Sequence, residues 1–300
     1  MDATLRTADG LALQVRDWPV AQPRGTVLLV HGLGEHISRY LHLAAALNDW
    51  GWNVVGYDQR GHGASPGARG RLAASDDLLA DLGRMVGATR HAHTGPLVLL
   101  GHSLGGLVAA RYVAEGCGDA TPAPWHRPVD ALVLSSPALD PGMNAGQRLL
   151  LALLGPIAPR LGVSNGLDPA WISRDPAVVA AYVADPLVHD RVAPRLVRFI
   201  VDAGALVRAR AAQWRVPTLL VWAGADRCVA PAGSAAFAAA APKGVVTGRA
   251  FEALFHEIFN EPEKQEVFAV LHDWLGALPR SAARAPGTPT LEASSRGDCT

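Results

Sequence analysis

The chain has 300 residues, of which 49% are hydrophobic and 18% are charged, and its formal net charge at pH 7 is zero. This composition is typical of a globular protein with a sizeable core, and the balanced charge gives no indication of a nucleic-acid partner. The cysteines at positions 117, 228 and 299 lack metal-ligand spacing, so we expect neither a disulfide framework nor a metal site. No apolar stretch has the length of a signal peptide or a membrane span, which predicts a soluble cytoplasmic protein.

The expected elements begin with a hairpin and continue as alternating strands and helices. Residues 4–6 and 11–16 flank Asp9-Gly10, a pair typical of a hairpin turn. Short, continuously apolar runs then predict strands buried on both faces, as in a parallel sheet, at residues 27–30, 54–57, 97–100, 131–134, 218–222 and 245–251. Helix-length stretches alternate with them, at residues 40–50, 76–91, 104–115 and 262–278.

This alternation predicts a doubly wound, mostly parallel α/β sheet with helices on both sides, in which ligands bind at the carboxyl ends of the strands. It stops between residues 137 and 214, where no strand is evident and one amphipathic helix is clear, around residues 196–207. We therefore expect a core of residues 1–136 and 215–278, interrupted by a helical lid over 137–214. Residues 279–300, rich in Ala, Pro, Ser and Gly, predict a disordered tail.

The strongest chemical signal is GHSLG at residues 101–105, between a predicted strand and a predicted helix. At such a turn, G-x-S-x-G is typical of a nucleophile elbow, where a strained backbone exposes the serine hydroxyl above the sheet. The two flanking glycines are expected because the tight turn leaves no room for side chains. The sequence therefore predicts Ser103 as a nucleophile, the alternative being a glycine-rich turn of structural use only.

A serine nucleophile needs a histidine base that is oriented by a carboxylate, and in doubly wound folds with this elbow both follow the serine along the chain. His256 lies between the last predicted strand and the final helix, at the catalytic edge of the sheet. Asp226 directly follows the strand 218–222 at that same edge. The rival positions are His126, His189 and His272 for the base, and Asp202 for the carboxylate.

The oxyanion that forms during acyl transfer needs two backbone N–H donors. Leu104 follows the nucleophile and is expected to supply one of them. The loop after the strand 27–30 reads HGLG at 31–34, and we expect Leu33 to supply the other. Such a site requires neither a metal nor an organic cofactor, so chelation is expected to leave the rate unchanged.

Further motifs preserve the order and spacing of one family: HGLGEHISRY at 31–40, YDQRGHGAS at 57–65, GHSLGG at 101–106, SSP at 135–137, ISRDP at 172–176, DPLVH at 185–189 and HEIFNE at 256–261. From about residue 4 to 278 the chain resembles the monoacylglycerol lipase and lysophospholipase branch of the α/β-hydrolases, and HG-x-GEH is the discriminating motif. The resemblance implies an α/β-hydrolase fold and the triad Ser103, Asp226 and His256. It further implies a lipid-like carboxylic ester of monoacylglycerol or lysophospholipid type, cleaved through an acyl-enzyme intermediate.

The resemblance also implies contacts with the polar head of the substrate. Glu35 and Arg39, in the GEH…RY segment, are expected near this head group, and Tyr182, shortly before DPL, resembles a further contact. The alternative for Glu35 and Arg39 is a local salt bridge that holds the loop.

The predicted lid contains a strongly apolar stretch at residues 149–163, and its basic residues are all arginine. A slightly basic element with an exposed apolar face is typical of proteins that lie on a membrane surface, so we expect transient, peripheral lipid contact there. The alternative is that this stretch belongs to the ordinary core.

Two other functions stay open from the sequence, which leaves the oligomeric state undecided. One is a different enzyme of the same fold, namely a proline-type aminopeptidase, a thioesterase or a general carboxylesterase. Aminopeptidases of this fold commonly bind the substrate amine with acidic lid residues, often glutamate, and residues 137–214 contain no glutamate, although they contain six aspartates. The other is a non-catalytic ligand-binding protein, which usually lacks one member of the triad.

Overall fold

The computed structural model describes residues 2–118 and 121–279. Within this part of the chain, eight strands form one sheet in the order β1-β2-β4-β3-β5-β6-β9-β10. The strands β1 (Asp2–Arg6) and β2 (Ala12–Trp18) form an antiparallel hairpin, and β2 is also antiparallel to its other neighbour, β4. The parallel strands are β3 (Thr26–Val30), β4 (Asn53–Tyr57), β5 (Leu97–His102), β6 (Ala131–Ser135), β9 (Thr218–Ala223) and β10 (Val246–Phe251). The predicted doubly wound, mostly parallel sheet is confirmed.

The sheet has a hydrophobic core on each face because alternate residues of a strand point to opposite sides. Leu28 of β3 packs with helices on one face, and its neighbour Leu29 packs with helices on the other. The first face is covered by α2 (Asp77–Ala92), α3 (Ser103–Glu115), α6 (Pro194–Ala209) and α7 (Pro231–Ala240). The second is covered by α1 (Leu41–Asp49) and α8 (Lys264–Ala277). The sequence did not predict α7, because its alanine-rich stretch has no apolar periodicity to detect.

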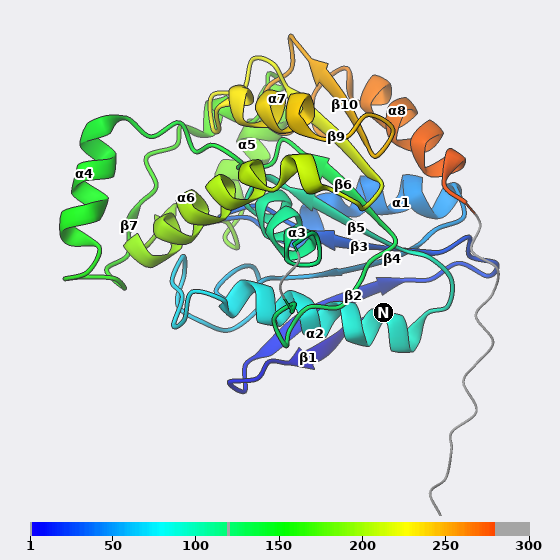
Figure 1. The fold of residues 1–300 in the computed structure, drawn as a ribbon, viewed down its shortest axis with the longest axis horizontal. Helices are drawn as coiled ribbons and strands as arrows, with labels where there is room; N and C mark the ends of the chain where they lie inside the picture. The colour runs from blue at the N-terminus through cyan, green and yellow to red at the C-terminus, as the bar shows by residue number, and fades with distance from the viewer. Residues whose placement is uncertain (1, 119–120, 280–300) are drawn as a thin grey trace, which may run out of the picture.

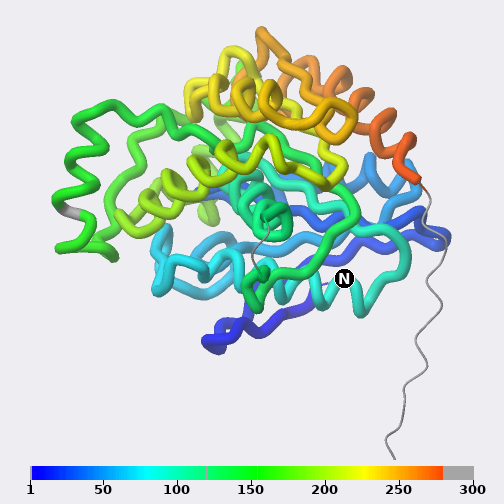
Figure 2. The backbone as a smooth tube through the Cα atoms, in the orientation of Figure 1, coloured from blue at the N-terminus to red at the C-terminus, as the bar shows by residue number. Residues whose placement is uncertain are grey.

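Figures 1 and 2 show the sheet running from the blue N-terminal hairpin at one edge to the orange strand β10 at the other. This order puts β3, β5, β6 and β9 near the middle, where their carboxyl ends face the same side. Short 3₁₀ turns add η1 (Ile37–Tyr40), η2 (Pro169–Trp171) and η3 (Ala211–Gln213). Among the described residues, no helix combines the length and apolar character needed to cross a bilayer.

Between β6 and β9 the chain leaves the sheet, where the sequence predicts a lid. This segment contains α4 (Ala145–Leu154), α5 (Pro176–Ala184) and α6, together with a small antiparallel pair of β7 (Val163–Ser164) and β8 (Arg191–Val192). Of these the sequence predicted only α6, and the expectation of no strand was wrong. Two-residue strands are too short to show a periodicity, and α5 is apolar throughout, which explains those omissions. In Figure 1, α4 projects away from the sheet, whereas α6 crosses α3. The tail predicted at 279–300 lies, apart from Pro279, outside the described residues.

Candidate active site

The turn that carries Ser103 joins strand and helix without a loop, because β5 ends at His102 and α3 begins at the next residue. Ser103 has a φ of 54°, a left-handed conformation that strains a residue other than glycine. A methyl group on Gly101 would lie 2.4 Å from the carbonyl oxygen of Gly105, and one on Gly105 would lie 2.2 Å from that of Val30. As predicted, neither position has room for a side chain, so the backbone of Ser103 is forced into the exposed turn.

Asp226, in the loop after β9, and His256, in the loop after β10, come together at the same edge of the sheet. Oδ2 of Asp226 lies 2.7 Å from Nδ1 of His256. The other carboxylate oxygen accepts the backbone N–H groups of Cys228, at 2.8 Å, and Val229, at 3.1 Å. Since an ionised carboxylate only accepts hydrogen bonds, Nδ1 carries the proton and Nε2 is left able to act as a base.

Opposing effects set the protonation of this pair. Burial alone would lower the pKa of His256, but the charge of Asp226 and the hydrogen bond to it raise this pKa above its usual value. Burial would likewise raise the pKa of Asp226, yet His256 and the two backbone N–H groups hold it below its usual value. The ionised carboxylate is thus suited to stabilise the imidazolium that forms when His256 takes up a proton.

The rival residues lie in other surroundings. Asp202 lies on α6, His126 packs its ring against Tyr112, and His272 is on α8 with its ring against Trp50. His189 lines the same cavity as Ser103 and His256, and its backbone N–H donates to the carbonyl oxygen of Gly34 at 2.8 Å. His189 therefore ties the insertion to the HGLG loop, and its ring nitrogens contact the backbone of Gly61 and Arg191, whereas Nδ1 of His256 contacts a carboxylate.

The HGLG loop approaches Ser103 closely. A methyl group on Gly32 would lie 3.1 Å from Cβ of Ser103. His31 anchors the loop from below, since its Nε2 accepts the backbone N–H of Gln59 at 2.9 Å. Leu33 and Leu104 both line the larger of the two cavities described below. Their backbone amides as oxyanion donors stay a prediction that this arrangement permits.

Glu35 and Arg39, expected near the substrate head group, form a buried ion pair of 2.7 Å. The second carboxylate oxygen of Glu35 accepts the N–H of Gly32 and the hydroxyl of Tyr40, each at 2.6 Å. Burial opposes ionisation here, but Arg39 and the other polar neighbours of this carboxylate together outweigh it, and the pKa of Glu35 falls to about 2. The alternative of a loop-holding salt bridge is thus present in the structure, and Glu35 also lines a cavity beside Ser103.

Arg39 extends this network to two more parts of the chain. Its guanidinium donates to both carboxylate oxygens of Glu257, at 2.6 and 2.8 Å, and lies 4.8 Å from the ring centroid of Tyr182 on α5. The sequence analysis missed Glu257, although it directly follows His256. The only available signal was its charge, opposite to that of Arg39. One guanidinium therefore joins the HGLG loop, the loop of His256 and the insertion.

A second polar contact fixes the insertion against the loop of His256. Glu261 is fully buried and accepts the hydroxyl of Ser173 at 2.7 Å and the backbone N–H of Phe255 at 2.9 Å. Its carboxylate also accepts the backbone N–H and the side chain of Arg174, each at 2.6 Å. The ISRDP and HEIFNE motifs therefore contact each other through Glu261. This contact gives a structural reason for the presence of both motifs in the family pattern.

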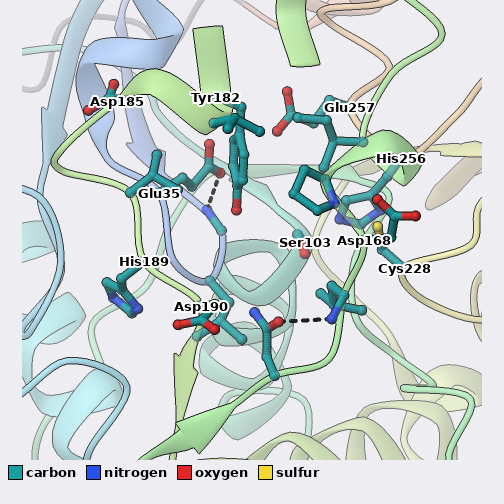
Figure 3. A pocket seen from close by; sticks show the side chains of 18 of the residues that line it. Glu35, Ser103, Asp168, Tyr182, Asp185, His189, Asp190, Cys228, His256 and Glu257 are labelled. Carbon is teal, nitrogen blue, oxygen red and sulfur yellow. Dashed lines mark hydrogen bonds between the residues drawn. The ribbon is translucent and has the colours of Figure 1, made fainter. Parts of the chain in front are cut away.

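Ser103 lies where two cavities meet. The smaller, about 340 Å³, is lined by several ionisable side chains among apolar ones, and Figure 3 shows Glu35, Tyr182 and Glu257 on one side of Ser103 and His256 beside it. The larger, about 720 Å³, lies under the insertion and is mainly apolar; its walls include Leu104, Met143, Leu150, Leu151, Val197 and Ile200. A chamber with many ionisable side chains and a mainly apolar chamber on either side of Ser103 suit an ester between a polar alcohol and a long acyl chain.

One group of described residues has the composition of a metal site. A carboxylate oxygen of Asp226, the thiol of Cys228 and a ring nitrogen of His256 all lie within 4.8 Å of one another. The sequence did not indicate this group, because His256 lies in a different loop from Asp226 and Cys228 and the three residues have no ligand-like spacing along the chain. Cys228 lines both cavities, and burial raises the pKa of its thiol well above the usual value.

Comparison with known proteins decides the family. The family model described as serine aminopeptidase, S33, matches residues 21–263. The monoacylglycerol lipase of Mycolicibacterium smegmatis is 36% identical over 261 residues, which cover 86% of this chain and 90% of that protein. The chain belongs to this family of α/β-hydrolases, in its monoacylglycerol lipase branch. It is a serine ester hydrolase, as the sequence predicted.

Other members of the branch are similar over nearly their whole length. The crystal structure of Paleococcus ferrophilus monoacylglycerol lipase superposes with a TM-score of 0.77 at 36% identity, covering 88% of this chain and 98% of that one. Phospholipase YtpA of Bacillus subtilis is 31% identical and covers 84% of this chain and 95% of its own. Within the monoacylglycerol lipase branch, the peptidase, thioesterase and non-catalytic alternatives are not favoured.

Proposed function

We propose that this hydrolase cleaves the ester bond of long-chain monoacylglycerols, with Ser103, His256 and Asp226 as its catalytic triad. The observation that carries the proposal is the position of Ser103, beside the Asp226–His256 pair, at the junction of a mainly apolar cavity and a smaller one with many ionisable side chains. The acyl chain would occupy the larger cavity and the glycerol the smaller one. The relatives named monoacylglycerol lipase support the same substrate class.

The proposed reaction has two halves. In the first, the Ser103 hydroxyl attacks the ester carbonyl while Nε2 of His256 accepts its proton, and His256 then returns this proton to the leaving glycerol oxygen. In the second, His256 activates a water molecule that releases the fatty acid from the acyl-enzyme. Leu33 and Leu104 would donate their backbone N–H groups to the oxyanion of both tetrahedral intermediates, where losing one donor typically costs about 10²–10³ in turnover.

Glu35, Arg39 and Tyr182 would form the floor of the glycerol site. Arg39 is already paired with Glu35 and Glu257, so the network presents a fixed polar surface whose charges are largely compensated. Such a surface suits a neutral, hydroxyl-rich head group better than a phosphate, because no unpaired cation of this network is left to bind the anion. Lysophospholipid is the second candidate, since one relative is named a phospholipase.

The experiment that tests the function compares kcat/KM for 1-oleoylglycerol, oleoyl lysophosphatidylcholine and p-nitrophenyl esters of increasing chain length. We expect monoacylglycerol to be the best head group and long acyl chains to be preferred up to the length the apolar cavity holds. An amino-acid p-nitroanilide and an acyl thioester serve as comparison substrates for the peptidase and thioesterase alternatives. Faster cleavage of either comparison substrate would overturn the proposal.

We further propose that the stretch 149–163 docks reversibly on lipid surfaces, so that the protein is peripheral at membranes. Leu149, Leu150, Leu153 and Leu161 are 58–60% exposed, and Ile157 is 78% exposed, which contradicts the alternative of an ordinary core. Leu150 and Leu161 also line the apolar cavity, so the exposed surface continues into its mouth. Exposed Arg148, which directly precedes this stretch, and exposed Arg160 within it would contact lipid phosphates.

Replacing Leu150 and Leu153 together with serine tests this docking. We expect weaker liposome binding and slower hydrolysis of 1-oleoylglycerol in vesicles, with the rate on short soluble esters retained. Leu41→Ser, an exposed leucine on α1 outside the insertion, is the matched control and should change neither property. Equal losses on soluble and vesicular substrates would count against docking.

A further inference from the structure

We propose that Asp226, Cys228 and His256 form an inhibitory binding site for a soft divalent cation such as Zn²⁺. The inference rests on the proposed catalytic roles of Asp226 and His256 and adds a ligand to their site. The three side chains offer a carboxylate oxygen, a sulfur and an imidazole nitrogen, all within 4.8 Å of one another. These are the atom types that zinc binds in proteins, and the sulfur disfavours Mg²⁺ and Ca²⁺.

The geometry requires only a small adjustment to hold an ion. Zinc bonds of about 2.0–2.3 Å place tetrahedral ligand atoms about 3.3–3.8 Å apart, so the widest present separation must shorten by about 1 Å. Rotation of the Cys228 side chain about its Cα–Cβ bond supplies a movement of that size. Three protein ligands then leave a fourth position for water, as in open zinc sites.

The surroundings of the three ligands support binding. Cys228 lines both cavities that meet at Ser103, so an ion that enters through either one reaches its sulfur. Within the described part of the chain, the thiol makes no hydrogen bond that the ion would have to displace. One oxygen of Asp226 is already held by the N–H groups of Cys228 and Val229, which orients the carboxylate before the ion arrives.

Binding at these residues stops hydrolysis because it occupies the groups that move the proton. A ring nitrogen of His256 bonded to the ion, with Asp226 drawn away from Nδ1, leaves the imidazole unable to accept the proton of Ser103. The Cys228 thiol releases its own proton to solvent when it binds the ion. No covalent bond of the protein is made or broken, so removing the ion restores the enzyme.

The test measures Zn²⁺ inhibition of the full-length protein on a soluble short-chain ester, after dialysis against EDTA. Zinc should inhibit the wild type, and renewed chelation should restore the rate. Cys228→Ser should need at least about tenfold more zinc for the same fractional inhibition, relative to its own metal-free rate. The matched controls Cys117→Ser, in the core, and Cys299→Ser, near the end of the sequence, should retain wild-type sensitivity.

A direct measurement separates metal binding from catalysis. Co²⁺ should give a thiolate-to-cobalt absorption band with the wild type and with Ser103→Ala, but not with Cys228→Ser. Because Ser103 is not a ligand, the Ser103→Ala variant should show this band although it does not hydrolyse esters. The cobalt measurement therefore tests the metal site separately from the proposed function. Equal zinc inhibition of the wild type and Cys228→Ser, or no inhibition at millimolar zinc, would overturn the proposal.

Discussion

The loops at the carboxyl edge of the sheet and helix α4 of the insertion differ in how their side chains are held. At the sheet edge, Glu35, Glu257 and Glu261 are buried and each accepts several hydrogen bonds, and Glu257 and Glu261 accept some of theirs from distant segments. On α4, the leucines are mostly exposed, and the helix is capped within itself by Asn144 and Gln147. The catalytic edge is thus fixed by many tertiary contacts, whereas α4 depends on few.

This difference separates two requirements of an enzyme that acts on lipid. Proton transfer needs groups held within a fraction of an ångström, which buried and hydrogen-bonded side chains provide. Admission of a long acyl chain needs an apolar surface that lipid can reach, and elements with few buried contacts open most easily. The insertion contains both kinds of segment, because residues 172–190 are tied to the sheet edge while 145–163 are not.

The largest effect should come from the fixed region. Ser103→Ala and His256→Ala are each expected to lower kcat by about 10⁶-fold, because triad members act as a unit, while Asp226→Asn should be severe but milder. The fold should persist, since a small exposed hydroxyl contributes little to packing. The measurements are p-nitrophenyl ester hydrolysis and labelling by a fluorophosphonate, which should modify Ser103 alone. A Ser103→Ala variant with more than about one hundredth of the wild-type rate would contradict the assignment.

The buried network predicts a large loss of stability from Arg39→Ala. Removing this guanidinium leaves Glu35 and Glu257 buried without their partner, which should cost about 3–5 kcal/mol in the free energy of unfolding. The matched control is Arg16→Ala, whose ion pair with Asp2 is exposed and should be worth less than about 1 kcal/mol. Urea unfolding measures both, and similar losses for the two variants would mean that the network is not a stabilising element.

The pH dependence should report the Asp226–His256 pair. The base acts only when neutral, so kcat/KM should fall as the pH drops through the pKa of His256, which lies above the usual histidine value. Asp226→Asn removes the charge that raises this pKa, so the acidic limb of the profile should move to lower pH. A pH–rate profile of both proteins measures this shift. A limb that moves to higher pH would show that Asp226 does not raise the pKa of His256.

The smallest effect is expected on α4. Leu153→Ala should change the free energy of unfolding by no more than about 0.5 kcal/mol, because this side chain is already exposed. Leu28→Ala, in the centre of the sheet, is the matched control and should cost about 2–5 kcal/mol by leaving a cavity. Thermal or urea unfolding compares them, and a large cost at Leu153 would mean that α4 packs more tightly than its exposure indicates.

Much of this protein could be predicted from sequence because the relevant signals are local. The buried strands are continuous apolar runs, and the elbow of Ser103 needs glycines only two residues away, where a side chain would meet the backbone. The family motifs are likewise short segments, and they occur in the order and spacing typical of the family. The fold class, the family and the ester hydrolase activity therefore followed from residues close together in the chain.

The remainder depends on segments that only the folded sheet brings together. The parallel register pairs Ala223 of β9 with Phe251 of β10, so the loops that follow lie side by side and Asp226 and Cys228 meet His256. The ion pair between Arg39 and Glu257 joins residues far apart in the sequence. The spacing of residue types along the chain does not predict such a contact. The exposure of α4 was equally undecided, because an apolar helix has the same sequence whether a neighbouring element covers it or leaves it to solvent.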